Sequence, residues 1–254
     1  MMIDCHSHLD DKRMVLFLDS LRGGAGSSLR VISNSVDLES SRRNLEISRE
    51  FDSVSCFVGV HPELFIHPEK TYSDETENGI GEELRKLAMV SQGIGEIGLD
   101  PKYGQMKLQK KLFETQLEVA ESFPHLPLSI HSRGTLREIM ETLSKFQLRN
   151  TILFHWFSGI DSELKIVNSK GYYVSFGLPI LFSKRLSGLV RSADPKLLLA
   201  ETDSPIIFQS LSNGLISPFA VSSVLFEMAS ILSIRFDEMV ENNEENAASY
   251  LMAS

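Results

Sequence analysis

The sequence predicts an α/β fold, a single (β/α)8 TIM-type barrel, and three observations predict it. Short apolar runs alternate with longer segments of helical period almost from end to end, which is the pattern of βα units around a parallel sheet. Eight such runs occur, each followed by a helical segment, whereas an open doubly wound sheet, the competing topology, usually has fewer strands. The 254 residues match the roughly 250 that such a barrel needs, so residues 1–254 are expected to form one domain.

The expected strands are the short apolar runs, and the expected helices are the segments that repeat apolar residues every three or four positions. The strands are predicted at residues 3–8, 29–33, 54–60, 93–97, 128–131, 151–155, 172–176 and 197–202. The helices are predicted at residues 15–22, 38–51, 82–90, 106–122, 135–146, 162–170, 183–191, 218–232 and 236–252.

Composition and charge limit the class of protein. Hydrophobic and charged contents of 42% and 23% are ordinary for a soluble globular protein. The net charge of −9 argues against holding nucleic acid by bulk electrostatics, although cations and a few local Lys or Arg residues could still meet phosphates. No apolar run reaches the roughly 18 residues of a membrane span, and no signal peptide is expected. Cys5 and Cys56 lack metal-site spacing and indicate reduced thiols in a cytoplasmic protein.

A glycine-rich stretch at residues 23–28 is the one segment that could suggest a phosphate-binding loop. It lacks a Gly-Lys-Ser/Thr ending, and it precedes a predicted strand instead of following one. We therefore interpret it as a flexible connector.

Residues that can bind metal recur at the carboxyl ends of the predicted strands. In a (β/α)8 barrel these ends converge on one rim, where the active site lies. Side chains scattered over 200 positions would thereby meet in one pocket. The residues are His6, His8, His61, Glu96, His131, His155 and Asp203.

The sharpest single signal is His6-Ser7-His8. Side chains at positions i and i+2 of a strand share a face, so both imidazoles can reach one metal ion. Two buried core histidines are the alternative, which is poor chemistry because four ring nitrogens would need partners. Asp4 lies on the same face one step deeper and could orient a ligand.

Four further strand ends carry ligand-type side chains. Glu96 lies in a glycine-rich segment, where a rim carboxylate can bridge two cations. His131 and His155 each close an apolar run, and their matching positions favour ligands over core histidines. Glu201 and Asp203 share a strand face, and Asp203 lies nearer the rim.

Other candidates are weaker. Arg133 could grip a phosphate, although a surface Arg at a helix start is an equal alternative. Lys102, Tyr103, Lys184 and Arg185 fall in predicted βα loops and could line a substrate groove. His67 and His125 fit no strand end and are interpreted as ordinary loop or surface residues.

With these residues in place, the sequence resembles the TatD-type deoxyribonuclease family, which is related to the amidohydrolase superfamily. The matching stretches occur in family order along nearly the whole chain. They are Ile3-Asp4-Cys5-His6-Ser7-His8-Leu9-Asp10, Gly59-Val60-His61-Pro62, Gly95-Glu96-Ile97-Gly98-Leu99-Asp100, His131-Ser132-Arg133, His155-Trp156-Phe157-Ser158-Gly159 and Glu201-Thr202-Asp203-Ser204-Pro205.

The resemblance implies a metal-dependent hydrolase of DNA phosphodiesters, often a 3′ to 5′ exonuclease on single strands. It implies one to three divalent cations, and we expect two per chain. One ion would lie on His6, His8 and Asp203, and another on His131 and His155, with Glu96 bridging. An imidazole-rich set favours Zn, Mn or Fe over Mg, the metal usual in assays of the family.

The catalytic residues expected are Asp203, as ligand and general base, and Glu96. His61 would face the substrate phosphate, and Arg133 would bind it. The implied chemistry is attack by a water that two metal ions activate. DNA is the expected partner, with no membrane and no protein partner inferred.

Two departures from the family pattern leave alternatives open. Residues 206–214 carry no positive charge where the family is basic, and Gly134 replaces the usual Asp after Arg133. A lactonase or amidohydrolase on the same ligands is one alternative, although Glu96 stands where such enzymes usually carry a bridging lysine. A non-catalytic metal-binding barrel is the other.

Overall fold

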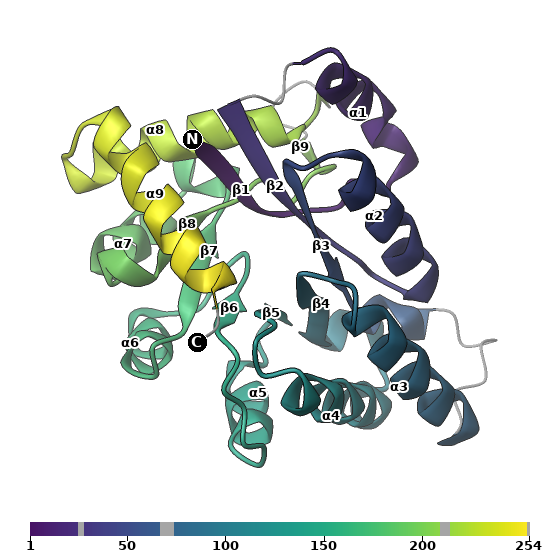
Figure 1. The fold of residues 1–254 in the computed structure, drawn as a ribbon. Coiled ribbons are helices and arrows are strands. Elements are labelled where there is room, and N and C mark those ends of the chain that lie inside the picture. The colour runs from purple at the N-terminus through teal and green to yellow at the C-terminus, as the bar shows by residue number, and fades with distance from the viewer. Residues whose placement is uncertain (25–27, 67–73, 209–213, 253–254) are drawn as a thin grey trace.

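Eight parallel strands surround the centre of the molecule in the order in which they occur along the chain (Figure 1). This computed structural model describes residues 1–24, 28–66, 74–208 and 214–252. The strands are β1 Met2–Ser7, β2 Leu29–Asn34, β3 Val54–Val58, β4 Gly93–Leu99, β5 Leu128–Ser132, β6 Ile152–Phe154, β7 Tyr173–Phe176 and β8 Leu198–Ala200. The predicted (β/α)8 barrel is confirmed.

The last step around the barrel differs from the other seven, because β8 and β1 share no ladder. They are joined instead at the carboxyl end by a parallel bridge between Ser7 and Ser204. There the N–H of His8 donates to the carbonyl of Ser204 at 2.6 Å, and the N–H of Asp203 donates to the carbonyl of His6 at 2.9 Å. The ring of strands therefore closes at the rim that carries the candidate residues.

Helices follow the strands and cover the outside of the ring (Figure 1). The α-helices are α1 Val15–Arg22, α2 Leu38–Glu50, α3 Asp74–Ala88, α4 Met106–Ser122, α5 Leu136–Leu143, α6 Asp161–Ser169, α7 Lys184–Ser192, α8 Val221–Leu232 and α9 Phe236–Leu251. Short 3₁₀ helices lie at η1 Lys12–Met14, η3 Pro62–Ile66, η4 Pro101–Tyr103, η5 Leu178–Leu181, η6 Pro195–Leu197 and η8 Pro218–Ala220. Apolar side chains of strands and helices form the main core between the two layers.

Helix α9 seals the seam between β1 and β8 below the rim. Asn243 accepts a hydrogen bond from the N–H of Ala200 and donates one to the carbonyl of Ile3, each at 2.9 Å. The Tyr250 ring packs against Phe57 and Tyr173, with centroids 6.0 and 5.5 Å away. A buried asparagine thus satisfies strand-edge groups that would otherwise lack partners.

The eight predicted barrel strands and nine predicted helices occur in the same order among the described residues, and the differences in their bounds are local. Predicted strands 54–60 and 151–155 end earlier, at Val58 and Phe154, because the chain turns toward the rim before the ligand-type residues. Helix α3 begins at Asp74 rather than at residue 82, since Ile80 packs with Val60, Phe65 and Leu112 and so outweighs two glycines.

The uncharged segment at residues 206–214 contributes to a pair of short strands that was not predicted from the sequence. Ile207–Phe208 (β9) and Gly214–Leu215 (β10) form an antiparallel pair. Residues 209–213 between them lie outside the described residues, as do residues 25–27 of the glycine-rich connector and His67.

Within the described ranges, no single helix is long and apolar enough to cross a membrane. One pair passes on length and composition, Pro218–Leu232 with Phe236–Leu251, but it bends by 109° at its break.

Candidate metal centre

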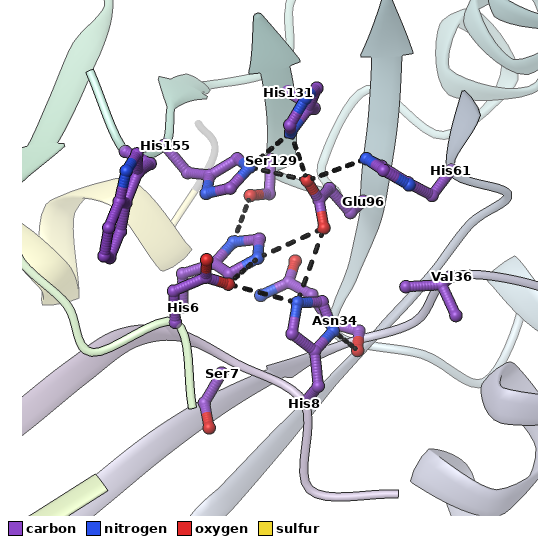
Figure 2. Close-up of polar contacts among 12 residues, drawn as sticks. His6, Ser7, His8, Asn34, Val36, His61, Glu96, Ser129, His131 and His155 are labelled. Atoms are coloured by element: carbon purple, nitrogen blue, oxygen red, sulfur yellow. Dashed lines mark hydrogen bonds and ion pairs between the residues drawn. The ribbon is translucent and has the colours of Figure 1, made fainter. Parts of the chain in front are cut away.

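Five of the seven histidines in the sequence gather at the carboxyl rim together with two carboxylates. Figure 2 shows Glu96 near the middle of this group, with imidazoles approaching it from different strands. The predicted rim residues that meet here are His6, His8, His61, Glu96, His131, His155 and Asp203.

The two carboxylate oxygens of Glu96 face two different sets of ring nitrogens. Oε1 lies 2.6 Å from Nε2 of His155 and 2.7 Å from Nδ1 of His131. Oε2 lies 3.4 Å from Nε2 of His6 and 3.5 Å from Nε2 of His8. Burial opposes ionisation of Glu96, but the charges of neighbouring imidazoles and these hydrogen bonds hold its pKa well below the usual value. The Glu96 carboxylate therefore lies between two groups of imidazoles, His6 with His8 on one side and His131 with His155 on the other.

The first group joins His6 and His8 to Asp203. Oδ1 of Asp203 lies 3.8 Å from Nε2 of His6 and 3.3 Å from Nε2 of His8. The other ring nitrogen of His8 donates to the carbonyl of Asn34 at 3.0 Å, and Nδ1 of His6 lies 3.0 Å from Oγ of Ser129. These contacts aim both Nε2 atoms at the centre.

Charge sets the protonation of this first group. Burial lowers the pKa of His8, but the hydrogen bond with Asp203 and the charge of Glu96 outweigh it and raise the pKa to about 9. Burial and the adjacent charge of His155 lower the pKa of His6. The rings of His6 and His155 stack at 3.7 Å, so the two cannot easily both carry a charge.

The second group contains His131 and His155. Nδ1 of His131 lies 3.2 Å from Nε2 of His155, and both atoms approach Oε1 of Glu96. Nε2 of His131 lies 3.1 Å from Oδ2 of Asp100, which fixes the ring by a carboxylate–imidazole contact typical of metal ligands. His61 completes the approach, with its Nε2 3.4 Å from Oε1 of Glu96.

The donor set fits divalent cations. In the part of the chain that the structure describes, there are three sets whose possible ligand atoms all lie within 4.8 Å of one another inside the set. They are His6, His8 and Asp203; His61, Glu96 and His131; and His6, His155 and Glu201. Among the described residues, buried Nε2 of His6, Nε2 of His61 and Nδ1 of His155 have no hydrogen-bond partner. Buried polar atoms without partners are costly, and nitrogen and carboxylate donors at this density are what Zn-type ions bind.

Close backbone packing places His131. Gly98 has φ +147° and pairs in register with His131 on the neighbouring strand. A Cβ at position 98 would lie 2.0 Å from the carbonyl oxygen of His131, so only glycine allows β4 and β5 to approach this closely. Gly98, two residues after Glu96, therefore serves close backbone approach between the two strands.

Several residues that hold the candidate ligands in place were not predicted from the sequence or have another role than the one expected. Asp100 and Ser129 hold His131 and His6 but carry no distinctive local signal. Glu201 lies behind the centre, where it accepts hydrogen bonds from Ser175 Oγ and the Trp156 N–H, both at 2.6 Å.

Asp4, expected to orient a ligand, contacts the backbone of the ligand His6, whose N–H lies 3.4 Å from its Oδ1, and not an imidazole ring. Its carboxylate accepts hydrogen bonds from the N–H of Thr202 at 2.8 Å and from Oγ1 of Thr202 at 2.5 Å. Asp4 therefore fixes the segment that leads to Asp203, because the strand seam brings Thr202 closer than any imidazole nitrogen.

A cavity of about 1370 Å³ opens above the centre. Lys102, Tyr103 and Arg133 line it, as predicted, and the Arg133 side chain is 62% exposed with Nη1 3.7 Å from Oδ2 of Asp100. Lys184 and Arg185 do not line it, which corrects the prediction. Arg185 instead donates to the carbonyls of Ser158 and Gly159, because α7 begins behind that turn.

The chain is similar to known proteins in sequence and in fold. The sequence pattern of TatD-related DNases matches residues 3–252. The chain belongs to the TatD-related DNase family. TatD-family relatives include an uncharacterized metal-dependent hydrolase of Methanocaldococcus jannaschii, 26% identical over 98% of this chain and 96% of that protein. Another is YabD of Bacillus subtilis, also an uncharacterized metal-dependent hydrolase, 27% identical over 97% of each chain.

Solved TatD structures share the fold. The crystal structure of the TatD homologue YjjV from Escherichia coli K12 superposes with a TM-score of 0.86 at 22% identity, over 98% of this chain and 97% of that one. A TatD-family hydrolase from Entamoeba histolytica superposes with a TM-score of 0.81 at 18% identity, over 98% and 97%. The expected family is confirmed, and so is the barrel.

Proposed function

We propose that this TatD-family chain is a metal-dependent phosphodiesterase that hydrolyses DNA, working from the 3′ end of a single strand. The observation that carries the proposal is Glu96, whose two oxygens face two separate groups of ligand atoms. A carboxylate in this position can serve two cations at once, and paired cations are a common device for phosphodiester hydrolysis. The family match supports the same reaction class.

The residues that would hold two divalent cations are His6, His8, Glu96, His131, His155 and Asp203. An imidazole-rich set suits Zn, Mn or Fe better than Mg, which prefers oxygen ligands and retained waters. Bound cations would supply positive charge against the phosphate and lower the pKa of water.

Asp203 is the proposed general base, and exposure decides between it and Glu96. The Asp203 side chain is 23% exposed and lines the cavity, whereas that of Glu96 is 5% exposed and surrounded by imidazoles. Both residues line the cavity, and the more exposed Asp203 has more room than Glu96 to accept a proton from a water that attacks a substrate there. Glu96 keeps the two halves of the centre together.

His61 and Arg133 are the proposed phosphate contacts. Nδ1 of His61 accepts a hydrogen bond from the N–H of Glu63 at 3.2 Å, so its Nε2 carries the hydrogen and can donate to a phosphate oxygen. Arg133 presents an exposed guanidinium at the cavity mouth, where it can make charge-assisted hydrogen bonds. With a net charge of −9, affinity for DNA would depend on such local cations.

The test is hydrolysis of a 5′-labelled single-stranded DNA oligonucleotide by protein loaded in turn with Zn, Mn or Mg. The expected product is a ladder that shortens from the 3′ end and disappears with chelator. A blunt duplex and an internally labelled circle separate exonuclease from endonuclease action. Cleavage of a lactone or small phosphodiester with DNA untouched would overturn the DNase proposal. Metal binding without any hydrolysis would indicate a binding barrel.

A further inference from the structure

Trp156 is an aromatic side chain on the wall of the cavity, immediately after His155 in the sequence. It is the only tryptophan of the chain. Its side chain is partly exposed, whereas the apolar residues of the adjoining strand β6 are fully buried. Around it the cavity wall is mostly charged or imidazole, including Asp203, His131 and Arg133.

A hydrogen bond to the buried carboxylate of Glu201 fixes the backbone conformation of Trp156. Trp156 has φ +46°, a left-handed conformation that is uncommon for a residue with a side chain. Its N–H donates to Oε1 of Glu201 at 2.6 Å, and Glu201, wholly buried, also accepts from Oγ of Ser175. A buried, doubly bonded carboxylate therefore offsets the strain of the left-handed residue.

The indole ring of Trp156 packs against Gly177, which has no side chain. A Cβ added to Gly177 would lie 2.5 Å from Cζ3 and 3.0 Å from Cε3 of Trp156. Position 177 thus supplies the space that the six-membered edge of the indole fills. The ring is fixed at its backbone and along one edge, and it contributes flat apolar surface to a cavity lined mostly by charged and imidazole side chains.

We propose that Trp156 is the stacking platform for a nucleobase next to the phosphate that is cleaved. The inference rests on the proposed function, because it assigns the aromatic recognition element of the same site. A partly exposed aromatic ring held beside a phosphate-binding centre is how proteins engage single strands without reading sequence. Since every base has a π-face, such a platform accepts any of the four bases and requires the base to be unpaired.

The test uses Trp156 as its own reporter, because no other tryptophan contributes to the emission. Metal-loaded protein is titrated with a phosphorothioate oligothymidine and, separately, with an abasic chain of the same length and charge. Stacking should quench the emission saturably with the base-bearing chain. The abasic chain should bind more weakly and quench little, because its phosphates remain and its bases do not.

Two variants separate stacking from packing. Trp156→Phe keeps an aromatic face, and Trp156→Leu keeps apolar volume without one. Stacking predicts that the leucine variant raises KM for single-stranded DNA about tenfold with kcat little changed, and that phenylalanine restores most of the loss. A leucine variant with wild-type KM for base-bearing DNA would overturn the inference, as would equal quenching by base-bearing and abasic chains.

The wild-type titration does not depend on how the variants fold or on hydrolysis. Base-dependent quenching without DNA cleavage would support Trp156 as an aromatic recognition element and overturn the DNase proposal. Metal-dependent cleavage of base-bearing and abasic DNA at equal rates would support the DNase proposal and overturn the role of Trp156.

Discussion

Asp203 is tied to His6 twice, through its backbone and through its side chain. Its N–H donates to the carbonyl of His6 at 2.9 Å, and its Oδ1 lies 3.8 Å from Nε2 of the same residue. The first contact helps close the barrel where β8 and β1 lack a ladder, and the second belongs to the candidate metal centre. The same two residues therefore take part in closing the barrel and in forming the candidate metal centre.

This coupling predicts that metal stabilises the fold. A ligand at a thousandfold excess over its Kd adds about 4 kcal/mol to the free energy of unfolding. For a chain of this size that corresponds to a rise in Tm of roughly 10 °C. Calorimetry with Zn or Mn, and again after chelation, measures the shift. An unchanged Tm in the presence of bound metal would contradict the coupling.

Glu96→Gln should lower metal content and reduce hydrolysis by about 100-fold or more, because the amide keeps the shape but loses the charge between the two imidazole groups. Elemental analysis and kinetics on the same preparation measure both. Glu141→Gln is the matched control, since the Glu141 side chain is exposed and forms an ion pair with Arg137 across one helical turn. Full metal content in Glu96→Gln would refute the bridging role.

Metal affinity should rise with pH, because a ligand imidazole must be neutral to bind. The pKa of His8 in the metal-free protein is raised to about 9, so below that pH the metal competes with a proton. Affinity should then grow at least tenfold per pH unit from pH 7 to 9. The raised pKa values of His131 and His155 act in the same direction. Competition with a chromophoric chelator gives the slope, and affinity independent of pH over this range would refute the assignment.

Asp100→Asn should weaken metal binding about 10- to 100-fold by loosening His131 while preserving the fold. Asparagine can still cap η4, where Asp100 Oδ1 accepts from the N–H of Lys102 at 2.8 Å. Asp194→Asn is a matched control, because Asp194 caps η6 in the same way, through the N–H of Lys196 at 2.9 Å, and does not line the cavity. Equal metal affinities of the two variants would remove the role given to Asp100.

Chemistry and substrate binding should separate between Asp203 and Arg133. Asp203→Asn removes the proposed base, so kcat should fall by about 100-fold or more. Arg133→Ala removes a contact made before and during the reaction, so it should mainly raise KM and flatten the salt dependence of binding. Steady-state kinetics at two salt concentrations tests both. The reverse pattern would exchange the two roles.

Local sequence patterns were enough to predict the order of strands and helices and the rim residues. Strand runs and helical repeats are local signals, and residues at i and i+2 of a strand must share a face, which already paired His6 with His8. Their recurrence at strand ends then predicted one rim, because parallel strands in a barrel all end on the same side. Nothing beyond local pattern and fold class was needed for that step.

Only the tertiary structure decided how those residues meet. Strand register and stagger decide three sets of contacts. They are the different partners of the two Glu96 oxygens, the contact of Asp100 with His131, and the hydrogen bond of Asp4 with Thr202. These residues are separated by up to about 200 positions, and no local repeat carries the register between them. The same holds for Trp156, whose ring position follows from a glycine and a buried carboxylate that come directly after β7 and β8, not from its own neighbours in the sequence.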